Sequence, residues 1–250
     1  MMQNIVPLVL HQIVPDGIEN QFEDVGISMF RRILGTCQGR CVSVDGKIVS
    51  NDLPGHHFLL TFDDGYGSDF DIVFPLLMQM DCTAIFFIIT EKIDTPGYLS
   101  WSQVRELHNA GMSIGSHSVS HPDMSCLSLS KQREEFLSSR LCIEDKIGAA
   151  VTSFSFPFGR FNRDMVKLAW DNGYRTVCTS KHGVTQLPAP LLPRNSINGL
   201  MSWDSVLRAL MATPVTRFKW AVEDMAKNSV RLVMGDGAYR TLRSILAKGK

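Results

Sequence analysis

The stretch Leu59-Leu60-Thr61-Phe62-Asp63-Asp64-Gly65-Tyr66-Gly67 joins an apolar run to two adjacent carboxylates and two glycines. The run predicts a buried strand, and the glycines predict a turn at its end. In a regular strand Asp63 and Asp64 would point to opposite faces, whereas a turn at Gly65 would bring both to one rim. In an α/β barrel the carboxyl ends of the strands carry the active site. The alternative is an Asp-Asp-Gly turn with solvated side chains.

The same alternation of apolar run and helical pattern repeats along most of the chain. The predicted strands are Ile5–Leu10, Phe58–Phe62, Ala84–Ile89, Met112–Gly115, Val151–Phe156, Tyr174–Cys178 and, more weakly, Leu191–Ile197. The predicted helices are Gly26–Leu34, Ser68–Met80, Trp101–Ala110, Ser130–Gly148, Arg163–Asn172 and Ser202–Met211. Such repeats predict parallel strands with right-handed crossovers, and 250 residues suffice for one α/β barrel. We expect an α/β fold, a barrel of seven strands in preference to an open doubly wound sheet.

The charge of the chain is balanced overall but not along its length. The 25 basic and 25 acidic residues cancel, which argues against a nucleic-acid-binding protein. Residues 214–250 nevertheless hold eight basic and three acidic residues, a net charge of +5, so the remainder carries −5. We expect residues 1–213 to form the barrel and residues 214–250 to form a basic helical extension of the same domain. Such clustered Lys and Arg would attract anionic lipid, although an ordinary solvated helix pair is the alternative.

The six cysteines and the first ten residues bear on the compartment. The cysteines are too sparse for a disulfide scaffold, and even Cys37 and Cys41 lack close C-x-x-C spacing, so we expect reduced thiols in or near the core. The N-terminal apolar run is broken by Pro7 and has no basic flank, which predicts a first strand instead of a signal peptide. No run approaches the 18 apolar residues of a membrane span. We expect a cytoplasmic chain, with contact between the basic extension and an anionic membrane as an option.

A second polar motif is Gly115-Ser116-His117-Ser118-Val119-Ser120-His121-Pro122. Two imidazoles four residues apart share a face if the segment turns helically, and that separation suits one metal ion. Two surface histidines are the alternative. Combined with one of the two carboxylates, the pair would leave a fourth metal position for water, as in hydrolytic zinc sites. The other carboxylate would then be available as a base.

Three ordered motifs carry a family resemblance. Thr61–Gly65, His117–His121 and Ser155-Phe156-Pro157-Phe158-Gly159 resemble motifs of the polysaccharide deacetylases, which are metal-dependent de-N-acetylases and esterases on a distorted (β/α)7 barrel. The resemblance covers roughly residues 5–200. It implies that Asp64, His117 and His121 bind a divalent metal and that Asp63 is the general base. It also implies that the loop Pro157-Phe158-Gly159 presents the Phe158 N–H to the oxyanion of the reaction.

The chain departs from this family at two positions. Ser155 stands where many members have an arginine that orients the catalytic aspartate, and Leu192-Pro193-Arg194-Asn195-Ser196-Ile197 lacks the histidine that serves as general acid. We therefore expect His11, at the end of the first strand, to supply the acid, with a hydrogen-bonded rim histidine as the alternative. Arg194 would orient Asp63 or stabilise the oxyanion. His182 is a weaker candidate for the acid, and His56 and His57 would lie at the opposite end of the barrel.

These observations favour one function over two others. The leading hypothesis is a metal-dependent hydrolase that removes N-acetyl groups from an amino sugar in a glycan or glycan precursor. The alternatives are an amidohydrolase acting on a small linear or cyclic amide, and a non-catalytic glycan-binding module. Zn²⁺ is the metal that the ligand set favours, and Co²⁺, Ni²⁺ or Mn²⁺ would suit similar ligands.

Overall fold

The computed structural model describes residues 4–18, 22–44 and 55–225 of the chain. Its main sheet contains eight parallel strands in the order β10-β1-β4-β5-β6-β7-β8-β9. These strands are β1 (Ile5–Leu10), β4 (His57–Phe62), β5 (Ala84–Ile88), β6 (Ser113–Ser116), β7 (Ser153–Ser155), β8 (Thr176–Cys178), β9 (Leu191–Leu192) and β10 (Asn195–Ser196). A separate parallel pair, absent from the sequence prediction, joins β2 (Ile13–Val14) to β3 (Val25–Gly26).

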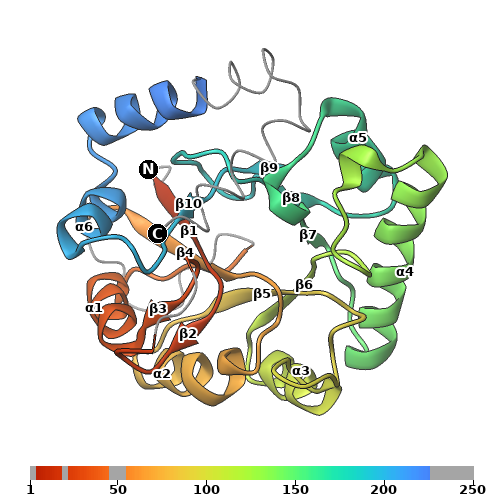
Figure 1. The fold of residues 1–250 in the computed structure, drawn as a ribbon, viewed down its shortest axis with the longest axis horizontal. Helices are drawn as coiled ribbons and strands as arrows, with labels where there is room; N and C mark the ends of the chain where they lie inside the picture. The colour runs from red at the N-terminus through yellow and green to blue at the C-terminus, as the bar shows by residue number, and fades with distance from the viewer. Residues whose placement is uncertain (1–3, 19–21, 45–54, 226–250) are drawn as a thin grey trace.

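The α-helices lie outside the sheet and surround it (Figure 1). They are α1 (Ile27–Cys37), α2 (Phe74–Gln79), α3 (Trp101–Asn109), α4 (Leu129–Ile147), α5 (Arg163–Asp171) and α6 (Trp203–Met211). Alternate strand residues face this outer layer and the barrel interior. Leu60 and Phe86 belong to the large core under the helices, whereas Leu59 and Phe87 belong to a smaller interior cluster. Two buried faces explain why β1, β4 and β5 are buried at every residue.

The last predicted strand closes the barrel by dividing in two. β9 pairs with β8, while β10 pairs with β1 at the other edge of the sheet. Pro193 and Arg194 lie between them, and proline cannot donate to a strand ladder. The break therefore lets one chain segment bridge both edges. The predicted (β/α)7 barrel is confirmed in this distorted form, and the open doubly wound alternative is wrong.

Two helix boundaries differ from the prediction for local reasons. The predicted helix Ser68–Met80 is a π-helical turn, Asp69–Val73, followed by α2. Pro75, the second residue of α2, has no N–H to donate to the preceding turn, which accounts for the wider winding before it. The predicted helix at Ser130 begins one residue earlier, because the side chain of Ser128 caps its first turn by accepting from the Lys131 N–H.

The C-terminal extension is described only in part. Residues 214–225 are helical (Figure 1, blue, upper left), and Trp220 in this helix is buried. The second predicted helix falls within residues 226–250 and lies outside the described residues. Within the described ranges, no helix combines the length and apolar character that crossing a membrane requires.

Candidate active site

The candidate residues meet at the carboxyl ends of the parallel strands. Asp63 and Asp64 follow β4, His117 follows β6, and Ser155 is the last residue of β7. The register of the sheet sets these ends side by side, since Leu10 pairs with Phe62 and Ile88 pairs with Ser116. A parallel barrel gathers the ends of its strands on one rim. Residues more than 130 positions apart in the chain therefore form one cluster.

Asp63 is held in a fixed position by three hydrogen bonds. Arg194 donates from Nη1 to Oδ1 and from Nη2 to Oδ2, both at 2.7 Å, and the Ser155 hydroxyl donates to Oδ2 at 3.0 Å. Arg194 Nη2 also donates to Ser155 Oγ at 2.7 Å, which closes a three-residue network. Although burial opposes the charged form, the Arg194 guanidinium holds the pKa of Asp63 well below its usual range. Asp63 is thus an oriented, ionised carboxylate.

Arg194 orients Asp63 through a buried set of hydrogen bonds. It lies between β9 and β10 and is 1% exposed, and Nη1 and Nε donate to Thr61 Oγ1 and the Thr179 carbonyl. Together with the bonds to Asp63 and Ser155, these contacts use all five N–H donors of the guanidinium. Of the two roles predicted for Arg194, the geometry therefore favours orienting Asp63 over stabilising an oxyanion. Thr61 and Ser155 complete the network; both stand in the motifs quoted from the sequence, but neither was predicted to hold Arg194 or Asp63.

Asp64 reaches the same rim through an unusual backbone. The sequence analysis placed the turn at Gly65, but Asp64 itself is left-handed with φ 78°, and Gly65 follows with φ 76°. Asp64 Oδ1 lies 3.4 Å from His117 Nε2 and 3.5 Å from His121 Nε2. Burial raises the pKa of Asp64 to about 6, and buried Oδ1 has no hydrogen-bond partner. A strained residue with an unsatisfied carboxylate oxygen is typical of a functional site.

The two histidines present the same ring atom to Asp64. His117 Nε2 and His121 Nε2 are 3.2 Å apart. His117 Nδ1 lies 2.8 Å from the Ser155 carbonyl, an acceptor that assigns the proton to Nδ1 and leaves Nε2 as a lone pair. Burial lowers the pKa of His117 to about 3 and lowers that of His121, so both rings are neutral. Neutral imidazoles are the form that binds metals.

The segment between the histidines is not the helical turn that their spacing suggested. Residues 117–121 form an irregular bend in which Ser118 and His121 are left-handed, with φ 71° and 57°. Glu135, on α4, holds this bend: its carboxylate accepts from the N–H groups of Val119 and Ser120 at 2.7 and 3.1 Å. The Ser120 hydroxyl also donates to it at 2.8 Å. Glu135 had no sequence signal, because the contact exists only once α4 packs beside β6.

A divalent cation fits this donor set. One ligand atom from each of Asp64, His117 and His121 lies within 4.8 Å of the others. The buried, unpartnered Asp64 Oδ1 has no other described cation or donor to satisfy it. Two imidazole nitrogens and one carboxylate oxygen form a three-ligand set that leaves a fourth position open for water or substrate. The donor set thus suits a catalytic metal better than a structural one.

His11 lies where the first-strand prediction put it, beside this cluster. It forms a second close group with Glu23 and Asp64, with one ligand atom of each within 4.8 Å of the others. Its Nδ1 is buried and has no hydrogen-bond partner. Glu23 was not singled out from the sequence, because it lies on the connection between β2 and β3. The structure therefore brings His11 to the site.

The loop Pro157–Gly159 borders the histidines on the other side. It forms a short helical turn in which Phe158 is left-handed, with φ 57°. The Phe158 ring is 49% exposed and meets the His121 ring edge-on, with centroids 4.7 Å apart. Gly159 allows close packing, because a Cβ there would lie 2.1 Å from Ser180 Oγ. The loop therefore presents its backbone and an aromatic face next to a candidate metal ligand.

The remaining histidines named from the sequence lie elsewhere. His182 Nδ1 is 3.0 Å from Asp224 Oδ1, and its ring stacks on Trp220 at 5.7 Å. These contacts attach the C-terminal helix to the barrel, which accounts for His182 without a catalytic role. His57 is the first residue of β4, and His56 precedes it. Both therefore lie at the end of the strand opposite Asp63.

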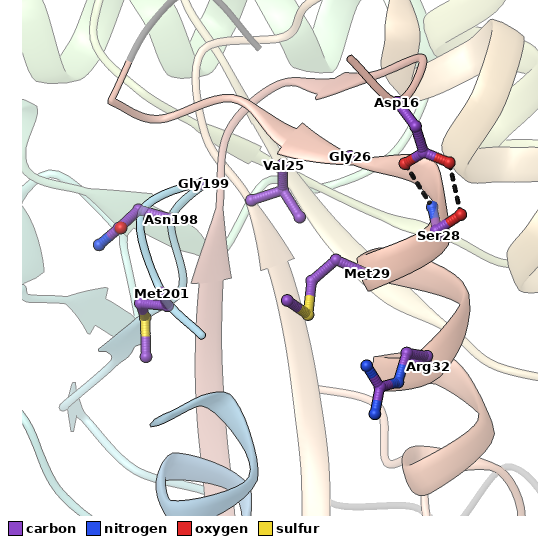
Figure 2. Close-up of a pocket in the computed structure, with 9 residues that line it drawn as sticks. All are labelled: Asp16, Val25, Gly26, Ser28, Met29, Arg32, Asn198, Gly199 and Met201. Carbon is purple, nitrogen blue, oxygen red and sulfur yellow. Dashed lines mark hydrogen bonds between the residues drawn. The ribbon is translucent and has the colours of Figure 1, made fainter. Parts of the chain in front are cut away.

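A separate pocket of about 270 Å³ lies between the start of α1 and the loop after β10 (Figure 2). Figure 2 shows Asn198 and Met201 on one side and Asp16 on the other. Asp16 accepts hydrogen bonds from the Ser28 N–H, at 2.9 Å, and from the Ser28 hydroxyl, and so caps α1. Arg32 stacks on Trp203 at 4.0 Å. These contacts satisfy the pocket's charged groups, and it contains none of the predicted site residues.

The parallel barrel and the Asp-His-His cluster define the chain as a (β/α)-barrel protein with a candidate metal site. A family model described as polysaccharide deacetylase matches residues 50–177, which is half of the chain. The chain belongs to the polysaccharide deacetylase family, as its motifs predicted.

Similar proteins support both the family and the fold. The chain is 30% identical over 125 residues to the protein YxkH of Bacillus subtilis, covering 50% of this chain and 45% of that protein. Peptidoglycan-N-acetylglucosamine deacetylase PgdA of Listeria monocytogenes is 26% identical over 155 residues, covering 61% of this chain and 31% of that protein. The chain thus spans less than half the length of either relative. Streptococcus pyogenes deacetylase PplD, solved with acetate, shows the same fold, with TM-score 0.72, 23% identity, and coverage of 84% of this chain and 99% of that chain.

Proposed function

We propose that the chain is a metal-dependent hydrolase that removes N-acetyl groups from an amino sugar in a glycan or glycan precursor. The observation that carries the proposal is the arrangement of two adjacent carboxylates around one pair of imidazoles. His117 Nε2 lies 3.4 Å from Asp64 Oδ1 and 3.9 Å from Asp63 Oδ2. One carboxylate is unsatisfied and suits a cation, while its neighbour is tied by Arg194. The two aspartates therefore have different roles.

Asp64, His117 and His121 would hold the metal, with Zn²⁺ as the first choice and Co²⁺, Ni²⁺ or Mn²⁺ as alternatives. A metal bound there would polarise the amide carbonyl and lower the pKa of water. The protein contributes the rigid positions of the three donors. The Ser155 carbonyl fixes the His117 ring, and Glu135 fixes the bend that carries His121.

Asp63 serves as the general base in this proposal. Its carboxylate is ionised and accepts the proton of the attacking water, and the bidentate contact with Arg194 prevents the side chain from rotating away. The Arg194 charge also makes Asp63 a weak base. Asp63 therefore depends on a cation at the Asp64 cluster to acidify the water that it deprotonates.

The remaining steps use groups on either side of the cluster. The N–H of Phe158 stabilises the oxyanion that forms on the former carbonyl oxygen. His11 donates a proton to the leaving amine, because its unpartnered Nδ1 and its position near Asp64 suit a proton-transfer role. The exposed Phe158 ring offers an apolar face for a sugar ring next to His121. This aromatic surface favours a sugar substrate over a small amide.

We also propose that the reaction takes place at the cytoplasmic surface of an anionic membrane. The helix of residues 214–225 is attached by buried Trp220, and its outer face exposes four apolar side chains at helical spacing: Val215 (67%), Phe218 (71%), Val222 (49%) and Met225 (68%). The 25 residues that follow contain six basic residues and one acidic residue. An exposed apolar helix face next to a cationic segment suits the surface of an anionic bilayer.

The test measures acetate release from N-acetylglucosamine oligomers, peptidoglycan fragments and small amides by the metal-loaded chain. We expect release from the N-acetylated sugars, its loss after chelation, and a kcat lower by about 10²- to 10⁴-fold in Asp63→Asn. His117→Ala should lose the bound metal, whereas His108→Ala, on α3, should retain it. Hydrolysis of small amides alone would support the amidohydrolase alternative, and sugar binding without acetate would support the binding module. Either result would refute the proposal.

A further inference from the structure

Three buried thiols gather at the amino-terminal end of the barrel, away from the candidate site. Cys37 ends α1, Cys41 follows it closely, and Cys82 precedes β5. The Sγ atoms of Cys41 and Cys82 are 2.7 Å apart, and Cys41 Sγ lies 3.6 Å from the Cys37 carbonyl. Cys41 is 0% and Cys82 is 3% exposed. Nothing in the proposed chemistry uses these groups.

The backbone places Cys41 beside Cys82 independently of the side-chain positions. Cys41 forms a parallel bridge with Phe58 of β4, and β5 pairs with β4 from Leu60, opposite Ala84. In β4 the N–H of His57 points to the β1 side, where it donates to the Asn4 carbonyl, so the next residue points to the β5 side. Cys41 therefore lies on the β5 side of β4. Cys82, two residues before the start of β5, reaches the same place along the strand.

We propose that Cys41 and Cys82 form a disulfide bond under oxidising conditions. Each thiol loses a proton, one sulfur–sulfur bond forms, and the two electrons reduce one glutathione disulfide to two glutathione thiols. A shared metal is the competing explanation for clustered cysteines. Among the described residues, however, the groups of three with metal-ligand spacing do not include these cysteines. The close contact between the Cys41 and Cys82 sulfurs therefore favours a disulfide over a shared metal.

The bond would enclose the catalytic aspartates. The covalent loop would run from residue 41 to residue 82 and contain β4, Asp63 and Asp64. Closing such a loop restricts the unfolded chain and so stabilises the folded one. In a reducing cytoplasm the pair would stay as thiols, whereas in an oxidising compartment it would close. The redox state of this pair therefore reports the compartment in which the chain folds.

Burial determines how the bond is made. The contact with the Cys82 thiol, together with burial, keeps the pKa of Cys41 far above its usual range, so little reactive thiolate exists in the folded chain. Both side chains are also almost completely shielded from solvent, and so from a dissolved oxidant. The bond is thus expected to form while the chain folds and to form slowly in protein that has already folded reduced.

The experiment refolds the denatured, reduced chain in glutathione redox buffer, then counts free thiols by alkylation in denaturant. We expect four alkylated cysteines of six, and a Cys41–Cys82 linkage in the non-reduced peptide map. Cys178→Ser, a buried cysteine outside this cluster, should form the same bond, whereas Cys82→Ser should keep five free thiols. Oxidised wild type should also unfold at a higher temperature than the reduced protein.

Six free thiols in refolded native protein, or a linkage between any other pair of cysteines, would overturn the proposal. If Cys82→Ser fails to fold, the peptide map of the wild-type chain decides by itself. Acetate release is not needed for either measurement, so this proposal and the proposed function fail separately.

Discussion

Arg194 and Asp63 form a bidentate ion pair, with both N···O distances 2.7 Å, between the break in the last strand and the end of β4. The break between β9 and β10 closes the barrel, so the same backbone feature brings a buried guanidinium to the proposed base. Ser155 is hydrogen-bonded to both partners. Arg194 thus holds Asp63 from the segment between β9 and β10, far along the chain from β4.

Removing this arginine should cost both stability and activity. Arg194→Met leaves Asp63 as a buried charge without its main partner, and breaking a buried ion pair in this way costs about 3–5 kcal/mol of unfolding free energy. Urea denaturation monitored by circular dichroism measures the loss. The kcat for acetate release should fall with it, because Asp63 loses the contact that orients it.

The matched control is the double variant Asp63→Asn with Arg194→Met. If the two side chains interact as the geometry shows, the double variant is less destabilised than the sum of the two single changes, by about 0.5–3 kcal/mol. Strict additivity of the two single changes would contradict the ion pair as the source of the effect.

The parts of the site that depend on short stretches of chain could be predicted from the sequence. The end of β4 follows from an apolar run and glycines, and the cluster around Asp64 follows from the family motifs. Periodicity also placed each main strand, because alternating strands and helices leave short-range hydrophobic signals. The division of the last strand was not predicted, since it depends on closing the barrel between β8 and β1.

The contacts that position the site residues could not be predicted from the sequence, because they join elements that are distant along the chain. Glu135 reaches the bend between the histidines only after α4 packs against β6, and a glutamate on a helix gives no sign of such a contact. The left-handed backbone of Asp64 and His121 was likewise hidden, since these conformations are imposed by tertiary packing and not by residue preference.

Glu135→Ala should weaken metal binding without touching a proposed ligand. Its carboxylate accepts from the N–H groups of Val119 and Ser120, so its removal frees the bend that positions His121. Residues that support ligands in this way change metal affinity by about 10- to 100-fold. Calorimetric titration of metal-free protein with Zn²⁺ measures the change. The control is Glu134→Ala, an exposed neighbour paired with Lys131 at 2.7 Å, which should bind zinc like wild type.

His11→Gln should lower kcat for acetate release by about 10²- to 10⁴-fold while zinc remains bound. The residue lies beside Asp64 but outside the Asp64–His117–His121 set, so losing it removes a proton donor and keeps the donors of the metal. The leaving group separates the roles further: an ester releases an alcohol more easily than an amide releases an amine, so ester hydrolysis should suffer less. Equal losses on both substrates would assign His11 a structural role.

The exposed face of the C-terminal helix should bind anionic lipid. Val215 and Phe218 are 67% and 71% exposed, so replacing both with serine removes apolar surface with an expected stability change within about 0.5 kcal/mol. In flotation with phosphatidylserine vesicles, wild type should float at low salt, and the double variant should float less.

Leu129→Ser removes a similarly exposed apolar residue (63%) from α4 and serves as the control. High salt should weaken binding, because the basic residues after position 225 supply the long-range attraction. Equal flotation of wild type and the double variant would contradict lipid binding by this helix face.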